Sequence, residues 1–292
     1  MTGRPFTLPA LLSAPYPSLP NAVNVGTLVT GNDPQLLTFQ LNPAAENQPA
    51  VTVSSVPAGT TGQFLTQQDT GPQWKALSSN IVLIESPAST YTVSTGTLYI
   101  KVELIGGGGG GSAPASVNGE GGRGGGGGGY WCSTLTRADN SLSDAPYTVS
   151  IGIGGSGGSS GGGAGTSGTN TTFLHPTLGT FTADGGTGAS TTAVGTGGSG
   201  SPQSSERIVI SGQNGGQRSS NASTGVGGSG GSSGKLFGAG GQSVVIGDGG
   251  AQNGSNGLLY GGGGGGGISA GGAVSGGNGA NGCIIITEFI AN

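Results

Sequence analysis

The chain has 292 residues, and 70 of them are glycine, several times the usual share of roughly 7%. Only 7% of the residues are charged, and 8 Lys and Arg against 12 Asp and Glu leave a formal net charge of −4. This balance excludes a basic, nucleic-acid-binding surface, and it is unlike the composition of an ordinary enzyme, in which about a quarter of the residues are charged.

Glycine is concentrated in one region of the chain. Seven of the 70 glycines precede residue 106, and the other 63 lie within residues 106–282. A collagen triple helix is disfavoured because no strict Gly-X-Y period is present. A flexible Gly/Ser linker is the simplest alternative, but strand-like pieces interrupt the glycine. These pieces are residues 147–151, 171–174, 179–183, 207–210 and 243–246. We therefore expect ordered glycine, held by dense backbone hydrogen bonding or by neighbouring chains.

Residues 1–22 contain five prolines, which exclude a helix or a central strand. Apolar residues are spaced among the prolines: Phe6, Leu8, Leu11, Leu12, Tyr16 and Leu19. We expect an extended Pro-rich anchor that lies across another subunit. A disordered tail is the alternative.

Residues 23–79 are expected to form a short β stem or attachment module. The alternating stretches 36–41 and 50–56 predict two strands. The following stretch, Gly-Gln-Phe-Leu-Thr at 62–66 with Pro-Gln-Trp at 72–74, resembles a short module of bacteriophage tail-fibre proteins. That module usually lies in trimeric fibre stems. The resemblance implies a small hairpin in which Phe64, Leu65 and Trp74 meet around a threefold axis.

Residues 80–105 predict three strands, at 80–84, 89–93 and 97–105. In the last of these, Leu98, Ile100, Val102 and Leu104 share one face. That face is wholly apolar, so we expect it to be buried against a second sheet.

A specific order of motifs surrounds the glycine. Tyr-Thr-Val-x-x-Gly-Thr at 91–97 precedes a strand and a glycine run, Tyr-Thr-Val-x-Ile-Gly starts at Tyr147, and Gly-Cys-Ile-Ile-Ile-Thr-Glu-Phe closes at Phe289. Together these resemble the glycine-rich domain of bacteriophage tail-fibre and receptor-binding virion proteins, over roughly residues 80–290. The resemblance implies that the opening and closing strands pair in one β-domain, with glycine segments in loops and packed layers between them. The stretches 133–145 and 199–233 depart from this pattern.

The expected fold is therefore all-β: an N-terminal extended anchor (1–22), a short β stem (23–79) and a β-sandwich-like domain with glycine-rich layers (80–292). The resemblance implies a homotrimer. Gly-Gly-Ser repeats such as 152–159 can form extended helices with three residues per turn, similar to polyproline II. Packed side by side, such helices can exchange backbone hydrogen bonds in several directions. We expect a polyglycine-II lattice of this kind within residues 106–282.

The sequence contains no pattern that predicts a catalytic site. Gly-x-Gly-x-x-Gly patterns occur without a βαβ context, so they carry no cofactor prediction. His175, the only histidine, is interpreted as a surface or turn residue, and the carboxylates are scattered. Cys132 and Cys283 favour two free buried thiols over one disulfide. We expect no metal, no cofactor and no enzyme activity.

Large aromatic residues isolated in glycine are the candidate receptor-binding residues: Tyr130, Trp131, Phe237 and Tyr260. Their rings offer rigid area for stacking on sugars or packing on a protein. The alternative is that they fill the only sizeable core that this region can build.

The expected function is that of a bacteriophage tail-fibre or tail-tip protein whose N-terminal segment attaches to other tail, baseplate or fibre proteins. Its glycine-rich domain would bind a host surface glycan or outer-membrane protein by avidity. A purely structural decoration or connector protein is the first alternative, and a tailspike glycan hydrolase is the second. The sequence contains no signal peptide or transmembrane stretch, so we expect a virion tail location, extracellular after lysis.

Overall fold

The computed structural model describes residues 25–30, 33–42, 50–56, 63–68, 71–85, 88–115, 118–201, 207–219, 226–234, 238–242, 244 and 250–291. All regular secondary structure in these residues is β-strand. The chain divides into two units, Met1–Leu77 and Ser78–Asn292. The predicted all-β class is confirmed for the described residues.

The first unit contains an antiparallel sheet in the order β1(Val25–Thr30), β2(Asp33–Asn42), β3(Ala50–Val56). Strand β4(Gln63–Gln68) then pairs with the first half of β5(Gly71–Ile84), and Leu65 lies opposite Trp74. The hairpin predicted for this stretch is thus confirmed.

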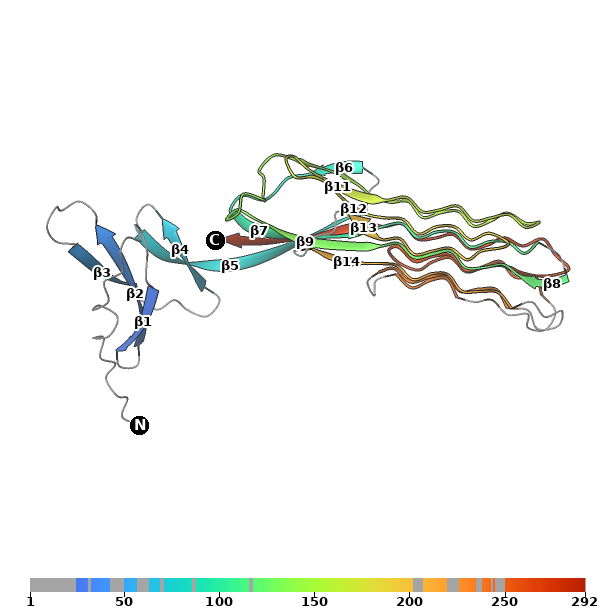
Figure 1. Cartoon of the computed structure of the whole chain (residues 1–292), viewed down its shortest axis with the longest axis horizontal. Helices are drawn as coiled ribbons and strands as arrows, with labels where there is room; N and C mark the ends of the chain where they lie inside the picture. The colour runs from blue at the N-terminus through green and yellow to red at the C-terminus, as the bar shows by residue number, and fades with distance from the viewer. Residues whose placement is uncertain are drawn as a thin grey trace, which may run out of the picture. The chain divides into compact units, whose positions relative to one another are not determined.

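The second unit contains two antiparallel sheets of five strands each. One has the order β13-β12-β11-β10-β6, and the other has the order β14-β9-β7-β16-β5, in which β5 is the strand that also pairs with β4 (Figure 1). The strands of the first sheet are β6(Ala88–Tyr91), β10(Tyr147–Ser150), β11(Thr171–His175), β12(Gly179–Ala183) and β13(Gly200–Ser201). The second sheet adds β7(Thr97–Ile105), β9(Tyr130–Thr136), β14(Ile208–Ile210) and β16(Cys283–Ala291) to the end of β5. As the resemblance implied, β7 and β16 pair along their length.

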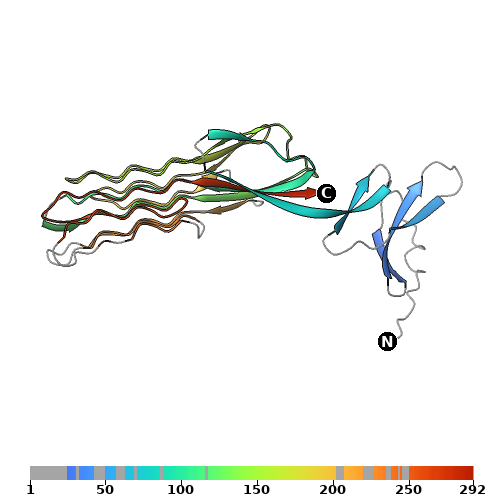
Figure 2. The same ribbon diagram turned by 180° about the vertical axis from the view of Figure 1, so that it is seen from behind.

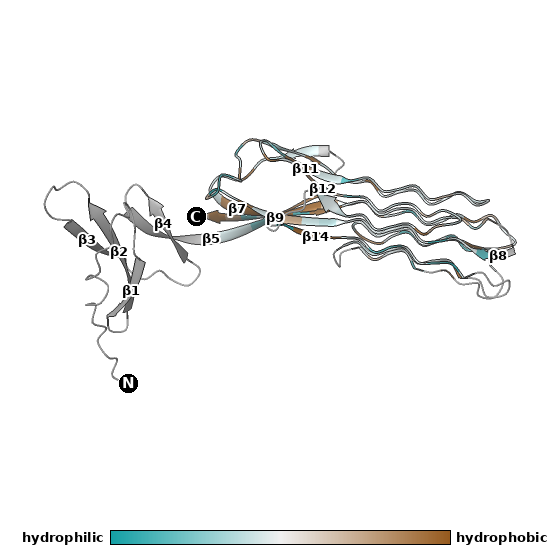
Figure 3. Cartoon of the chain, viewed as in Figure 1, coloured by the Kyte–Doolittle hydropathy of each residue, from teal (hydrophilic) through white to brown (hydrophobic). Residues whose placement is uncertain are grey.

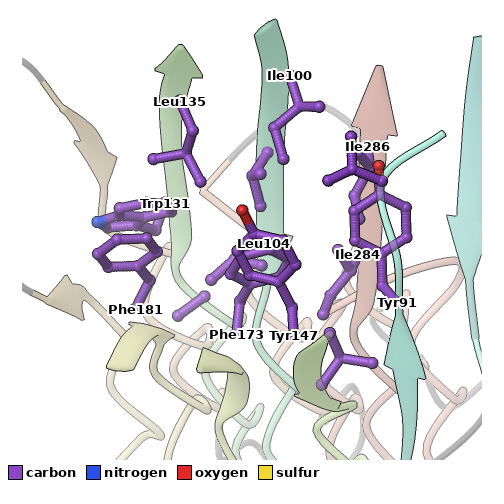
Figure 4. Close-up of a cluster of buried hydrophobic side chains, with 14 of the residues drawn as sticks. Tyr91, Ile100, Leu104, Trp131, Leu135, Tyr147, Phe173, Phe181, Ile284 and Ile286 are labelled. Carbon is purple, nitrogen blue, oxygen red and sulfur yellow. The ribbon is translucent and has the colours of Figure 1, made fainter. Parts of the chain in front are cut away.

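The apolar core lies between these two sheets (Figure 4). Ile100, Val102 and Leu104 of β7 are fully buried there, as their alternation predicted. Trp131 of β9 stacks on Phe181 of β12, with ring centroids 4.6 Å apart. The hydropathy colouring in Figure 3 places the apolar residues on these strands and leaves the glycine segments pale.

Glu288 contributes a buried carboxylate next to the core residue Tyr91. Glu288 of β16 has no exposed surface. It accepts hydrogen bonds from the Tyr91 hydroxyl (2.6 Å), the Asn80 amide (2.9 Å) and both the backbone N–H and the hydroxyl of Ser94 (3.0 and 2.8 Å). Burial raises the pKa of this carboxyl, but the hydrogen bonds outweigh burial and the net pKa is lowered.

Beyond the sandwich, the chain forms a bundle of extended glycine-rich segments. The segments continue from the strands, extend away from the sandwich, reverse direction in a turn and lead back to the sandwich, as both views show (Figures 1 and 2). We call this the glycine bundle. Among the described residues it consists of three inner segments (106–113, 122–129 and 261–267) and nine outer ones (151–159, 163–170, 184–190, 193–199, 211–219, 226–234, 238–242, 250–258 and 274–282).

Backbone hydrogen bonds in the glycine bundle follow a period of three residues. In segment 106–113, the amide of Gly106 and every third amide after it donate to segment 122–129. The amide that comes one residue later in each triplet donates to segment 163–170, and the amide two residues later donates to segment 274–282. The N···O distances are 2.8–3.1 Å. Carbonyls of the same segment accept from 151–159, 184–190 and 261–267. The other two inner segments repeat this arrangement, so each inner segment is bonded on all sides.

The close approach of the backbones explains where glycine is required. A Cβ added to Gly109 would lie 2.0 Å from the Thr187 carbonyl oxygen, and one added to Gly126 would lie 2.0 Å from the Thr196 carbonyl oxygen. Every glycine of the inner segments has such a backbone neighbour, which is why the long glycine runs of the sequence form the bundle interior. An outer segment such as 151–159 has a solvent-facing position every third residue, and there it carries Ile153, Ser156 and Ser159.

Asparagine side chains replace the missing backbone partners at the bundle surface. The Oδ1 atoms of Asn278 and Asn281 accept from the amides of Gly157 (2.7 Å) and Gly154 (2.9 Å) in the adjacent segment. Asn253 and Asn256 bond the next pair of segments in the same way. In each pair the two asparagines lie three residues apart, as the period of the bundle requires.

We expect the double substitution N278A/N281A to lower the free energy of unfolding by about 1–2 kcal/mol, because two outer amides lose their acceptors. Urea unfolding at neutral pH measures this loss. S156A is the matched control, because Ser156 is exposed on the facing segment and its substitution should leave the urea midpoint unchanged. Equal midpoints for all three proteins would show that these asparagines contribute nothing to the bundle.

Candidate functional site

The turns at the far end of the glycine bundle form the candidate site. We call this region the distal end; it includes residues 114–115, 160–162, 191–192 and 269–273 and the two-stranded sheet of β8(Asn118–Gly121) and β15(Ile268–Ala270). β8 marks it in Figure 1. Gly161 and Gly271 have φ values of +86° and +101°, and a Cβ added to either would meet no atom within 4 Å. The turns therefore face open space, while their ends are fixed by the bundle.

A shallow depression lies in the distal end. It is lined by turn residues from three places in the chain: Pro114, Ala115, Ser160, Gly161, Ser269, Gly271, Gly272, Ala273 and Val274. Its lining is small and uncharged, and the hydroxyl of Ser269 is already used in a 2.7 Å bond to the Gly272 carbonyl. Such a surface can accept a flat ring or a small apolar group.

Charged side chains gather next to β8 at the same end. Arg218 Nη1 lies 3.3 Å from Glu120 Oε2 and donates to the Gly121 carbonyl at 3.2 Å. Arg123 Nε donates to the amide oxygen of Gln217 at 3.1 Å. These residues come from two stretches of the chain, 120–123 and 217–218, that the bundle brings together. The sequence does not predict this cluster, because the spacing of its residues along the chain forms no recognisable motif.

The predicted recognition residues Tyr130 and Trp131 are core residues, which corrects their assignment to receptor contact. Trp131 is fully buried between the sheets, and Tyr130 is 3% exposed. The Tyr130 hydroxyl donates to Glu103 Oε1 at 2.6 Å, and burial, with this bond, raises the pKa of Tyr130. The alternative interpretation, that these rings fill a core, is the correct one.

The remaining predicted site residues lie elsewhere. Tyr260 is partly exposed at the turn between segments 250–258 and 261–267, and its hydroxyl donates to Glu85. Phe237 and the anchor residues Phe6, Leu8, Leu11, Leu12, Tyr16 and Leu19 lie outside the described residues. The strand predicted at 243–246 also falls largely outside them.

Cys132 and Cys283 are both buried and form no disulfide, as predicted. Burial raises the pKa of Cys283 to about 12, so its thiol is held in the unreactive protonated form. Both cysteines pack with Ile105 and Tyr130 in a small cluster on the outward face of the second sheet. These are structural thiols.

His175 is a buried turn residue and not a surface one, since only 2% of it is exposed. Its Nδ1 accepts from the amides of Thr177 (3.1 Å) and Leu178 (3.0 Å), which places the proton on Nε2. Nε2 then donates to the Ser141 carbonyl at 2.6 Å. His175 thus fixes the tight turn between β11 and β12.

Within the described residues, no group of three or more His, Cys, Asp or Glu is placed to hold a metal ion. The same residues contain no helix of the length and apolarity needed to cross a bilayer.

The fold and the site together define an all-β, glycine-rich domain in which a sandwich supports a hydrogen-bonded bundle. Comparison with protein families matches residues 85–288 to the family described as the glycine-rich domain. Because this match covers more than half of the chain, the protein belongs to the glycine-rich domain family. A search of curated proteins found no match.

Proposed function

We propose that the chain is a bacteriophage tail-fibre or tail-tip protein whose glycine bundle is a polyglycine-II lattice that displays its distal end to a host surface. The observation that carries this proposal is the bonding of the three inner segments on every side. Such a bundle has little freedom to bend, so its turns are held as a fixed surface. Rigid display lowers the entropy cost of contact with a partner.

In this proposal the N-terminal segment attaches the chain to other virion proteins, and three copies assemble. With three copies in one assembly, a weak contact at each distal end would give a higher overall affinity for the host surface through avidity. The partner would be a glycan or an outer-membrane protein of the host, and the protein would act by binding and not by catalysis.

Binding of the labelled full chain to a panel of bacterial strains tests the proposal. We expect binding to at least one strain, and we expect A273R to abolish it by placing a long side chain in the depression. T95R is the matched control, since Thr95 is exposed in the turn before β7, outside the bundle. Undiminished binding by folded A273R would exclude the depression as the contact. Release of reducing sugar during the assay would instead favour the glycan hydrolase.

The second candidate is a structural connector, and one observation favours it. Ile81 and Leu83 of β5 are 69% and 49% exposed on the outward face of the second sheet, where Ile208 and Ile210 of β14 are also exposed. Apolar residues on an open sheet face suit contacts with further subunits. Loss of assembly in I81S/L83S, with no cell binding by the unaltered chain, would favour this function over the first.

A further inference from the structure

Two arginines, Arg123 and Arg218, lie close enough at the distal end to interact electrostatically with each other and with the carboxylate of Glu120. Arg123 is the second residue of the inner segment 122–129, and Arg218 lies near the end of segment 211–219. Glu120 is paired with Arg218 at 3.3 Å. Arg123 has a neutral partner, Gln217. Among the described residues, the cluster therefore has two positive charges and one negative charge, in a chain that has only 8 Lys and Arg in total.

The Arg123 guanidinium is also short of hydrogen-bond acceptors. Its Nη1 atom is buried and has no partner among the described residues. Burial, followed by the nearby charge of Arg218, lowers the pKa of Arg123, although Glu120 acts in the opposite direction. A buried donor without an acceptor is unfavourable, and it is common where a ligand or an ordered water completes the bond.

The position of the cluster allows a ligand to reach it. Gln217, whose amide oxygen accepts from Arg123, is exposed, and the ion pair of Arg218 and Glu120 is partly exposed. The Arg123 backbone cannot shift, because its amide bonds to the Ser112 hydroxyl (2.8 Å) and its carbonyl accepts from the Ser112 amide (2.9 Å). The guanidinium is therefore presented from a fixed base.

We propose that Arg123 and Arg218 form a subsite for an oxyanion, a phosphate or carboxylate group carried by a surface glycan. A planar guanidinium fits two oxygens of such a group with parallel hydrogen bonds. The ligand oxygen would supply the acceptor that Nη1 lacks, and its charge would balance the two arginines. The glycan as the source rests on the proposed function, whereas the oxyanion chemistry rests on the cluster alone.

The test uses the full chain and three sugars that differ at one carbon: glucose 6-phosphate, glucuronate and glucose. Binding is followed by the NMR shifts of the arginine Nε–H groups. We expect one or both anions to shift the Arg123 and Arg218 signals with saturation, and glucose to shift neither. The stronger anion identifies phosphate or carboxylate. R123Q should weaken anion binding about tenfold or more, the size expected for a charge-assisted pair of hydrogen bonds.

Two further variants separate binding from a structural role. E120Q removes the competing carboxylate and should tighten anion binding about threefold or more, which a purely structural arginine cluster would not do. R137Q is the matched control, because Arg137 pairs with exposed Asp144 near the end of β9, outside the bundle. It should bind as the unaltered chain does. Equal binding by R123Q, or no saturable shift with either anion, would overturn the subsite.

The same variants separate this proposal from the proposed function. Anion binding without cell binding would keep the subsite and exclude the host-attachment role. Cell binding that R123Q leaves unchanged would keep the attachment role and exclude the subsite.

Discussion

G126A is expected to prevent folding of the glycine bundle, with a loss of about 4 kcal/mol or more, or no folded protein at all. A Cβ at this position would lie 2.0 Å from the carbonyl oxygen and 2.3 Å from the carbonyl carbon of Thr196. Both obstructing atoms belong to the backbone of a neighbouring segment, which is itself held by hydrogen bonds to other segments. The strain cannot be relieved by a rotamer change, so it is transmitted through the packed interior.

G250A is the matched control for this substitution. A Cβ added to Gly250 meets no atom of the described residues within 4 Å, and the φ of Gly250 does not lie in the left-handed region. The same chemical change should there be neutral or slightly stabilising, because alanine reduces the entropy of the unfolded chain. Thermal and urea unfolding of both variants measures the contrast. Similar stability of G126A and G250A would contradict the close packing described for the inner segments.

E288Q is expected to lower the free energy of unfolding at neutral pH by about 3 kcal/mol, since the buried carboxylate accepts four hydrogen bonds and an amide cannot accept them all. Y91F removes one of these bonds and should cost about 1–2 kcal/mol. Urea unfolding measures both losses of stability. A larger loss for E288Q than for Y91F would distinguish the hydrogen-bond network from a general effect of substitution in the core.

The same carboxylate makes stability depend on pH. Because the pKa of Glu288 is lower in the folded protein than in the unfolded chain, its contribution is fully present above the unfolded value of about 4.3. The contribution is lost as the pH falls from there through the folded pKa. The unaltered chain should therefore lose more stability than E288Q between pH 5 and the acid range. Parallel stability curves for the two proteins would show that Glu288 is not the group responsible.

The sequence predicts the strands of the sandwich better than their arrangement. The alternation of residues 97–105 predicts β7 and its buried face, and the strand at 179–183 coincides with β12. Strand β9 was not predicted, although it is the neighbour of β7 in the sheet. Its first residues follow a glycine run and its last ones begin a polar loop, so no alternating stretch of usual length is visible. The pairing of strands far apart in sequence leaves no local pattern.

The glycine bundle illustrates a second limit. The three-residue repeat of Gly-Gly-Ser predicts extended segments with three residues per turn, and the observed hydrogen bonds have that period. The inner or outer place of a segment can also be predicted, because the long uninterrupted glycine runs lie in the inner segments. The hydrogen-bond partners of each segment cannot be predicted from the sequence, because one glycine run has the same side-chain pattern as another. For the same reason, Arg123, Arg218 and Glu120 could not be brought together from sequence alone.

The sequence predicts a recognition role for Tyr130 and Trp131 because they are large residues isolated in glycine. The structure places them where the glycine bundle ends and the sandwich begins, so their isolation in sequence reflects a boundary between two kinds of packing. Large side chains are excluded from the bundle, whereas Trp131 fills the sandwich core and Tyr130 fills the small cluster on the outward face of the second sheet.

The three-residue period of the bundle restricts how this domain can change by insertion and deletion. Adding one or two residues inside a segment would turn every later amide toward the wrong neighbour, whereas adding three would require the whole bundle to lengthen. The distal turns lie outside that register. Sequence changes should therefore accumulate in the distal turns, while the length of the glycine bundle stays constant.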